Sequence, residues 1–473
     1  MGRNKDLAKN TAYVAIGSFG GSLIGFLMLP LYTRWLSPAD YGVTDIISTY
    51  SSLLLFIVSF CISEAIFVFP VGQSKEKITS YYTTGWLFLL SCSVLCAVVF
   101  YSLSFVESKS SFFDNLWLIY ITLISGVVLR YCQDFCRGIK KMSVFSFTGI
   151  IMSLGIALFS FVFIPHCGIK GYVIASVLAS LCSALFAFLY SGSYRYFSIH
   201  SFDKECLKEM LKFSIPLIPT SVMWWIVSSL NRPLLEQYVG LFAIGLFAIA
   251  NKLPSILNNV FGYFQKAWQV TVIEEFHNAD FSVYYNRMFR VIFSVQVLLT
   301  IIITVFSKLF ITIFTTEEYY SAWVYIPILS LSVLFSNGSA FCGTLFAASH
   351  ETKYTFYSVL VGAVVAVVAN FAFIPWLGLQ GACIAICLSH VAGMISRIYF
   401  SSRYVKFDSL LYVLVQMLAV GVVYCGVKTE NIYLIVLSVI IGCGLYYISN
   451  KNEIKNNMQL AMKVFDKWKK NVM

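Results

Sequence analysis

The sequence predicts an all-α polytopic membrane protein with about 14 transmembrane helices, and three observations support this fold class. Hydrophobic residues make up 59% of the 473 residues, and charged residues make up only 12%. The mean hydropathy is +0.79. A membrane-spanning helix takes about 20 apolar residues, so the apolar content suffices for roughly fourteen of them. So few charges exclude a globular enzyme with a membrane anchor and a protein that binds nucleic acid.

The predicted spans are separated mostly by short loops, which leaves no room for a large domain outside the bilayer. Two longer polar loops, 192–211 and 268–285, are expected on the same side. Hydropathy windows of about 19 residues place the spans near 10–36, 41–70, 78–105, 114–137, 143–165, 168–191, 212–237, 241–267, 286–314, 321–349, 354–375, 379–402, 409–427 and 431–449.

The distribution of Lys and Arg predicts the orientation. The net charge is +11, and most of the excess lies before the first span, after the even-numbered spans and in the C-terminal tail. Cytoplasmic segments of membrane proteins are rich in Lys and Arg, so both termini are predicted to be cytoplasmic. Residues 451–473 alternate lysines with apolar residues three or four apart. This tail is either an amphipathic helix on the inner membrane surface or a solvated basic segment.

An internal repeat divides the chain. Phe163-Ile164-Pro165, followed by Gly168 and Gly171, recurs 210 residues later as Phe373-Ile374-Pro375, followed by Gly378 and Gly381. A fainter match, at an offset of 203, pairs Tyr41-Gly42-Val43 with Ile244-Gly245-Leu246. Spans one to six and seven to twelve are therefore predicted to be two parallel copies, and transporters built in this way bind substrate between the copies.

The repeat fixes the predicted domain organisation. We expect an N-lobe of six spans, a cytoplasmic linker, a C-lobe of six spans, a final pair of spans and the basic tail. The corresponding ranges are 1–191, 192–211, 212–406, 407–450 and 451–473.

Three segments resemble a known family. They are Pro30 to Gly42 (PLYTRWLSPADYG), Phe213 to Pro219 (FSIPLIP) and Gly240 to Lys252 (GLFAIGLFAIANK). The sequence resembles Wzx-type polysaccharide and O-antigen flippases of the multidrug/oligosaccharidyl-lipid/polysaccharide (MOP) exporter superfamily, and the likeness extends over essentially the whole chain. The family often has an Asp-Arg pair in span seven, whereas this sequence has Asn231-Arg232.

The resemblance implies a MATE-like arrangement of two six-helix lobes around a cavity that opens alternately to each side. It also implies an oligosaccharide cargo on undecaprenyl diphosphate, flipped across the bacterial inner (plasma) membrane during O-antigen, lipopolysaccharide or similar polysaccharide biosynthesis. Membrane lipids are expected partners, and a polysaccharide polymerase and a chain-length regulator are further candidates.

Ionisable side chains inside predicted spans are the candidate site residues, because charge in the hydrocarbon region is costly and usually functional. A cationic cavity would suit a diphosphate, which accepts bidentate hydrogen bonds from Arg. Lys252 and Arg232 are the hardest to explain by snorkelling to an interface, which remains the alternative for Arg34, Arg290, Arg397 and Lys308. The candidate substrate-binding residues are Lys252, Arg232, Arg34, Arg130, Arg290 and Arg397.

The intramembrane carboxylates suggest how transport could be driven. Asp45 and Glu64 both lie in the second span, nineteen positions apart, too far to act as a catalytic pair. The sequence has no G-x-x-x-x-G-K-[ST] motif for nucleotide binding. We therefore expect antiport of H⁺ or Na⁺ at Glu64 or Asp45, with no cofactor and no metal site. The alternative is that each carboxylate pairs with a nearby Arg or Lys, as the spacing of Arg130 and Asp134 also allows.

Three other functions are compared with this hypothesis. A lipid II flippase for cell-wall synthesis shares the span count and a cationic cavity. A MATE-type multidrug or cation antiporter is expected to have a more acidic cavity. A membrane-embedded enzyme such as a polysaccharide polymerase is expected to carry a sizeable periplasmic loop, which this sequence lacks, so the protein is not expected to be an enzyme.

Overall fold

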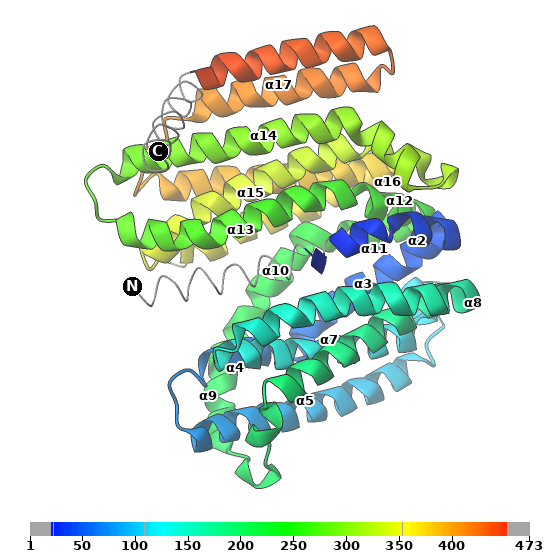
Figure 1. The fold of residues 1–473 in the computed structure, drawn as a ribbon, viewed down its shortest axis with the longest axis vertical. Helices are drawn as coiled ribbons and strands as arrows, with labels where there is room; N and C mark the ends of the chain where they lie inside the picture. Colours follow the sequence, from blue (N-terminus) through cyan, green and yellow to red (C-terminus); the bar gives the residue numbers. More distant parts are fainter. Residues whose placement is uncertain (1–19, 22, 108–109, 352, 452–473) are drawn as a thin grey trace, which may run out of the picture. The chain divides into compact units, whose positions relative to one another are not determined.

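The computed structural model describes residues 20–21, 23–107, 110–351 and 353–451, and this part of the chain is helical, with no strand (Figure 1). Ten of its helices are long and apolar enough to cross a membrane. The number is eleven if α12 (Leu241–Ala250) and α13 (Lys252–Glu275), which are bent by 43°, form one span. The predicted all-α polytopic class is confirmed, while the total of fourteen spans stays a prediction.

The described residues belong to two compact units. The first consists of residues 1–249, 314–320 and 366–385, and the second of residues 250–313, 321–365 and 386–473. These units do not coincide with the predicted lobes, whose boundaries and arrangement remain predictions.

Helices α3 to α9 supply most of the first unit. Buried aromatic rings of α5 and α7 form its centre, where the Tyr131 hydroxyl donates to the carbonyl oxygen of Tyr82 at 2.8 Å. The α-helices of this unit are α2 (Leu29–Trp35), α3 (Pro38–Val58), α4 (Ile62–Val68), α5 (Lys75–Leu103), α6 (Ser111–Asp114), α7 (Leu116–Gly138), α8 (Met142–Tyr190), α9 (Lys204–Ser214), α10 (Ile218–Ser229), α11 (Asn231–Tyr238), most of α12 and the middle of α16 (Lys353–Ser401).

The segment predicted as a cytoplasmic linker, 192–211, packs against the first helical turns of α5. The hydroxyl of Thr83 donates to the carbonyl oxygen of Tyr196 at 3.3 Å, and the hydroxyl of Tyr81 donates to Glu209 at 2.6 Å. The segment is also more helical than expected, because Asp203 caps α9 by accepting from the backbone N–H of Glu205.

The repeated Pro-x-x-Gly-x-x-Gly motif has the same backbone in both copies. Helices α8 and α16 (Lys353–Ser401) each contain 49 residues, more than twice the about 20 residues that cross one bilayer core. Each is interrupted at a glycine, Gly168 (φ 54°, ψ −127°) and Gly378 (φ 55°, ψ −130°). Only glycine adopts these angles readily. The local repeat is thus a structural one, and each long helix is two predicted spans joined by this turn.

The second half of the motif is explained by close packing after the turn. A Cβ added to Gly171 would lie 2.3 Å from the carbonyl oxygen of Phe163, and one added to Gly381 would lie 2.2 Å from that of Phe373. No side chain fits at such distances. The second glycine of each copy is therefore required by the way the chain folds back.

The fainter repeat marks a helix crossing within the first unit. A Cβ on Gly42 of α3 would lie 2.1 Å from the carbonyl oxygen of Leu241, and one on Gly245 of α12 would lie 1.9 Å from that of Pro38. Leu241 and Gly245 are the counterparts of Pro38 and Gly42 at an offset of 203. The two helices thus cross backbone to backbone, with matching contacts on both sides.

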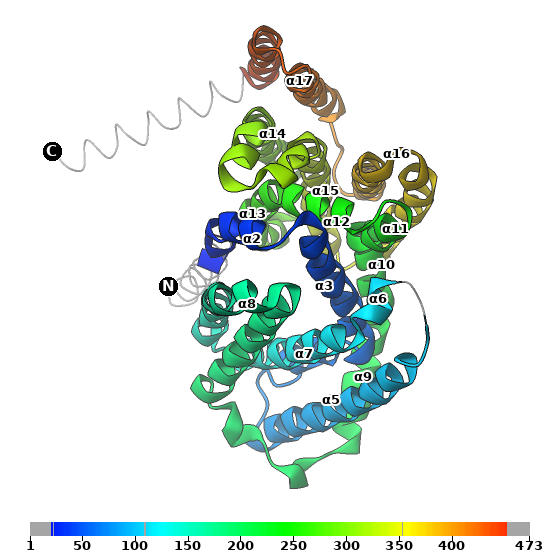
Figure 2. The same ribbon diagram turned by 90° about the vertical axis from the view of Figure 1, so that its right-hand side faces the viewer.

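The second unit has an aromatic core, and α13, α14 and α15 lie side by side in it (Figures 1 and 2). The hydroxyl of Tyr285 donates to the carbonyl oxygen of Phe341 at 3.1 Å, and both rings are buried. The elements here are α13, nearly all of α14 (Phe281–Phe314), the second half of η4 (Glu317–Val324), α15 (Ile326–Ala348), the two ends of α16, α17 (Leu410–Lys428) and a last helix, Ile432–Lys451.

Two ion pairs attach α17 to α14 at opposite ends. Arg290 contacts Asp408 at 2.9 Å, and Lys308 contacts Glu430 at 2.8 Å. Arg290 and Lys308 are eighteen residues apart on α14, which corresponds to about 27 Å. This separation is close to the thickness of a hydrocarbon core, about 30 Å, so both pairs are placed near its boundaries.

Two predicted spans are interrupted helices in the structure, and two predictions lie outside the described residues. The span 41–70 is broken between α3 and α4, and the span 212–237 consists of the end of α9, a 3-10 turn, α10 and α11. The first half of the span 10–36 and nearly all of the basic tail 451–473 fall on residues that the structure does not describe.

Candidate functional site

The candidate site lies beside a break in a predicted membrane span. Helix α3 ends at Val58, and Phe60 (φ 49°) and Cys61 (φ 53°) then adopt left-handed conformations before α4 begins at Ile62. Neither residue is a glycine, so the conformation is costly and is typical of functional sites. A side chain satisfies part of the opened backbone, because the Cys61 thiol donates to the carbonyl oxygen of Phe56 at 3.7 Å. In membrane proteins, broken helices are tolerated where they line a cavity.

A cavity of about 380 Å³ lies beside this break, inside the first unit. Its walls come from α3, α4, α7 and α10 and combine small hydroxyl groups with one thiol and two charged groups. The lining residues are Ser52, Leu55, Phe56, Ser59, Cys61, Ser63, Glu64, Arg130 and Ser221. The cavity can therefore hold a polar or charged group in a region where the surrounding helices are apolar.

Arg130 of α7 is the central charge of the cavity, because it bridges two carboxylates. Its Nη2 lies 2.8 Å from Oε1 of Glu64 on α4, and its Nε lies 2.6 Å from Oδ2 of Asp134, one turn further along α7. Arg137 holds the other oxygen of Asp134 at 2.8 Å. The four side chains form a network with no net charge, which offsets part of the cost of placing them among apolar helices.

The members of this network differ in their access to the cavity. The side chain of Asp134 is 2% exposed, whereas those of Glu64 and Arg130 are 41% and 45% exposed. Arg137 also stacks its guanidinium on the ring of Phe67, 4.1 Å from the centroid. Asp134 and Arg137 thus anchor Arg130, and Glu64 is the partner that an entering ion or ligand can replace.

A second ion pair joins α3 to α11. Nε of Arg232 lies 2.8 Å from Oδ2 of Asp45, and its Nη1 donates to the carbonyl oxygen of Ser228 at 2.8 Å. The guanidinium lies over the ring of Phe247, at 5.0 Å from the centroid. Nη1 also donates to Oδ1 of Asn231, at 3.2 Å. Asp45 of α3 therefore supplies the carboxylate partner that the sequence lacks at position 231.

The remaining predicted residues lie elsewhere. Arg34 is exposed in the last turn of α2, and Lys252 begins α13 at the bend after α12. Arg290 is paired with Asp408. Arg397 is only 5% exposed and donates to the hydroxyl of Ser358 and the carbonyl oxygen of Ser339. Contact of these four residues with a cargo stays a prediction, as it does for Arg130 and Arg232.

Sequence reasoning found some members of the network and missed others. The spacing of Arg130 and Asp134 indicated their ion pair, and the structure confirms it. The same helical spacing could have found Arg137, three residues after Asp134. Cys61 and Ser221 gave no signal, because the break in the helix contains neither glycine nor proline. Among the described residues, no cluster of His, Cys, Asp and Glu could hold a metal ion.

Comparisons with known proteins agree on the type of protein. Residues 7–268, more than half of the chain, match the family described as polysaccharide biosynthesis protein. A protein of the Lsg locus of Haemophilus influenzae is 22% identical over 258 residues, which cover 53% of this chain and 62% of that protein. The capsular polysaccharide biosynthesis protein CapF of Staphylococcus aureus is 20% identical over 409 residues, which cover 84% of this chain and 100% of that protein.

Solved structures share the fold. A lipid II flippase MurJ in an inward closed conformation superposes with a TM-score of 0.74, at 14% identity, over 94% of this chain and 99% of that chain. An inward-facing multidrug resistance transporter of the MATE family and MOP superfamily gives 0.64, at 12% identity, over 82% and 96%. The family match confirms the predicted resemblance to polysaccharide biosynthesis proteins, and these structures confirm the predicted fold.

Proposed function

We propose that this chain, which belongs to the polysaccharide biosynthesis protein family, is a multi-pass membrane flippase that moves an oligosaccharide linked to undecaprenyl diphosphate. The cargo crosses the bacterial inner membrane by alternating access, with both termini of the protein in the cytoplasm. A polymerase and a chain-length regulator are proposed to use the product.

The observation that carries the proposal is Arg130, a half-exposed guanidinium held at a polar cavity by a buried carboxylate. A diphosphate must lose much of its hydration in the membrane, and charge-assisted hydrogen bonds from a fixed Arg replace it best. Asp134 and Arg137 fix the position of Arg130. Only Nη2 must exchange its partner, from Glu64 to a phosphate oxygen. The hydroxyl of Ser63 lines the same cavity and can donate to another phosphate oxygen, whereas those of Ser52 and Ser59 already donate to backbone carbonyl oxygens.

Glu64 is the proposed coupling residue, with Asp45 as the second candidate. Glu64 faces the cavity and can take up H⁺ or Na⁺ when it leaves Arg130, whereas Asp134 is closed off from solvent. Asp45 is less exposed than Glu64, at 23%, and its partner Arg232 makes several other contacts. Antiport through Glu64 is therefore favoured over antiport through Asp45.

Lipid II flipping is the second candidate function, because its cargo presents the same lipid diphosphate with a different attachment. A cationic multidrug substrate is less compatible with the proposed site, since it offers no phosphate oxygen to Arg130. The charge of the site suits both an oligosaccharide on undecaprenyl diphosphate and lipid II. Only a measurement of which lipid is flipped distinguishes these two functions.

The experiment reconstitutes the full chain in proteoliposomes that contain a prenyl-diphosphate oligosaccharide, and follows its appearance on the opposite leaflet with an impermeant lectin. Wild-type protein is expected to flip this lipid, and Arg130→Gln to lower the rate by at least about tenfold. The matched control is Lys353→Gln, which removes one cation from an exposed pair with Glu351. Equal rates for the wild type and Arg130→Gln would contradict the proposed site. If only lipid II is flipped, the proposed cargo is wrong, but the proposed binding site at Arg130 is retained.

A further inference from the structure

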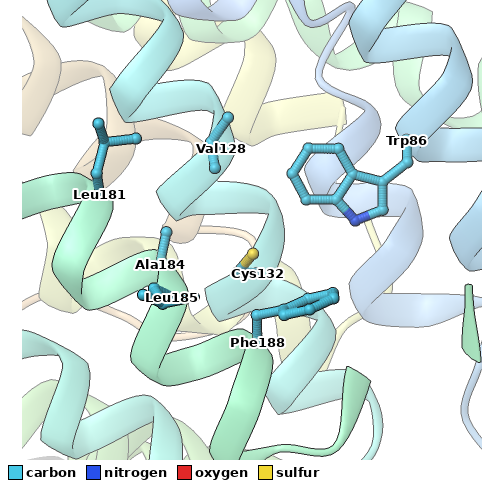
Figure 3. Close-up of a pocket in the computed structure, with 7 residues that line it drawn as sticks. All are labelled: Trp86, Val128, Cys132, Leu181, Ala184, Leu185 and Phe188. Carbon is cyan, nitrogen blue, oxygen red and sulfur yellow. The ribbon is translucent and has the colours of Figure 1, made fainter. Parts of the chain in front are cut away.

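An apolar groove on the first unit lies apart from the polar cavity (Figure 3). It has a volume of about 280 Å³. Trp86 of α5 forms one side, Val128 and Cys132 of α7 form the floor, and the second half of α8 forms the other side (Figure 3). The α8 residues are Leu181, Ala184, Leu185 and Phe188.

The groove and the polar cavity occupy opposite faces of α7. Successive residues of an α-helix are turned by about 100°. Val128 and Cys132 therefore share one face, and Arg130 points about 200° away from each of them. The cargo site proposed above is thus separated from the groove by the body of α7.

The groove is open to the surroundings of a membrane-spanning unit. Leu185 is 57% exposed, and Leu181 is also exposed on the same helix. Both belong to a segment apolar enough to cross a bilayer. Hydrocarbon is the only medium that suits such a surface, so a lipid chain is the occupant that this position favours.

The guanidinium of Arg195 lies near one end of the groove. The ring of Phe188, which lines the groove, packs against Tyr194 with centroids 6.3 Å apart. Tyr194 in turn holds Arg195: Nε donates to the tyrosine hydroxyl at 3.2 Å, and the guanidinium lies 5.4 Å from the ring centroid. Among the described side chains, no carboxylate lies within ion-pair distance of Arg195. Lys141 is near the same end, where its Nζ donates to the carbonyl oxygen of Ser191.

The position of the groove along the helices matches a lipid that reaches the membrane surface. Phe188 is two residues from the end of α8, and Trp86 is eleven residues from the start of α5. At 1.5 Å per residue, the groove extends from about 3 to about 16 Å below that end of the unit. A chain in the groove would thus place its headgroup beside Arg195 and Lys141.

We propose that this groove is a binding site for an anionic phospholipid, with one acyl chain between Trp86 and Leu185 and the phosphate on Arg195. Charge complementarity favours an anionic over a zwitterionic headgroup, by about fivefold for one cation at the surface. The site is distinct from the cargo cavity and does not depend on the identity of the cargo.

The test uses the full chain in detergent and two photoreactive probes, phosphatidylglycerol and phosphatidylcholine, each with a diazirine on one acyl chain. Crosslinked peptides from α7 and α8 are measured by mass spectrometry. We expect about fivefold more crosslinking with phosphatidylglycerol. Arg195→Gln should reduce it to the level of phosphatidylcholine, whereas Lys208→Gln, an exposed lysine of α9, should not. Leu185→Trp fills the groove and should abolish crosslinking of both lipids, and Leu158→Trp, on an exposed face of the first half of α8, should not.

Three results would overturn the proposal. One is an unchanged phosphatidylglycerol preference in Arg195→Gln, and another is unchanged crosslinking in Leu185→Trp. The third is displacement of phosphatidylglycerol from these peptides by an equimolar prenyl diphosphate, which would assign the groove to the cargo. A melting temperature within a few degrees of the wild type shows that each variant is folded, and Ala184→Phe replaces Leu185→Trp if that variant is not.

Discussion

Helices α7 and α15 are counterparts in the internal repeat, yet they carry different chemistry. Both have 23 residues, and α15 begins and ends 210 positions after α7. At that offset, Arg130 corresponds to Ala340, Asp134 to Thr344 and Arg137 to Ala347. The repeated backbone is thus kept, while the charges occur in only one copy.

Buried polar groups of α15 bond to partners inside its own unit. Asn337 donates to Oε1 of Gln296 at 2.9 Å, and both side chains are buried. The carbonyl oxygen of Ser339 accepts from the buried Arg397. In α7, by contrast, Arg130 remains 45% exposed at a cavity and shares its bonds with an exposed carboxylate. A charged side chain in a membrane helix therefore indicates a functional site when one of its partners can be replaced by a ligand. It indicates a structural role when the side chain and all of its partners are buried.

The largest effect is expected from giving α7 the residue that α15 has. Arg130→Ala removes the exchangeable cation and leaves Glu64 without its described partner. Polymer production in a strain that depends on this protein, with a matching sugar unit, should fall at least about tenfold. Quantitative blotting of surface polymer, normalised to the amount of protein in the membrane, measures the effect. An unchanged amount of surface polymer would mean that Arg130 of α7, like the polar residues of α15, has only a structural role.

The next largest effect concerns the shared backbone. Gly171→Ala and Gly381→Ala each place a Cβ within 2.3 Å of a carbonyl oxygen, so both should destabilise the protein by about 3 kcal/mol. Thermal unfolding in detergent should show falls of similar size, whereas Gly421→Ala, with open space around its Cβ, should show none. A fall in melting temperature for only one of the two variants would contradict the structural equivalence of the two copies of the motif.

Glu64→Gln should change coupling more than stability. Arg130 keeps Asp134 in this variant, so the melting temperature should stay within a few degrees of that of the wild type. The dependence of flipping on an imposed H⁺ or Na⁺ gradient should be lost in proteoliposomes. Gradient dependence equal to that of the wild type would move the coupling site elsewhere, with Asp45→Asn as the next variant to measure.

The smallest effect is expected in α15. Asn337→Ala removes one neutral hydrogen bond, and such bonds between membrane helices contribute about 0.6 kcal/mol on average. Flipping should be unchanged, and the melting temperature should fall by a few degrees at most. A loss of flipping comparable to that of Arg130→Ala would contradict the division between a functional and a structural copy.

Local patterns in the sequence predicted much of the fold. Hydropathy found the helices, and Pro165-x-x-Gly168 and its copy found the turns, because proline and glycine restrict the backbone wherever they stand. The break at Phe60 and Cys61 was not predictable, since residues of ordinary preference take a left-handed conformation there under tertiary constraint. The spacing of Arg130 and Asp134 indicated a local ion pair.

Pairings between distant residues could not be assigned from the sequence. Glu64 and Arg130 are 66 positions apart, and Asp45 and Arg232 are 187 apart. The sequence marked all four as candidates because each is charged within a span, and it allowed that the carboxylates might pair with cations without naming which. Burial was equally invisible: Arg397 and Arg130 look alike in the sequence, yet one is enclosed and the other lines a cavity.

Calorimetric titration of a short prenyl diphosphate into the purified full chain tests the role of Arg130 most directly. Binding to Arg130→Ala should be at least about tenfold weaker than to the wild type, because one charge-assisted hydrogen bond contributes about 1.5–3 kcal/mol. Lys353→Gln should bind as the wild type does. Equal affinity for the wild type and Arg130→Ala would show that α7 does not hold the diphosphate.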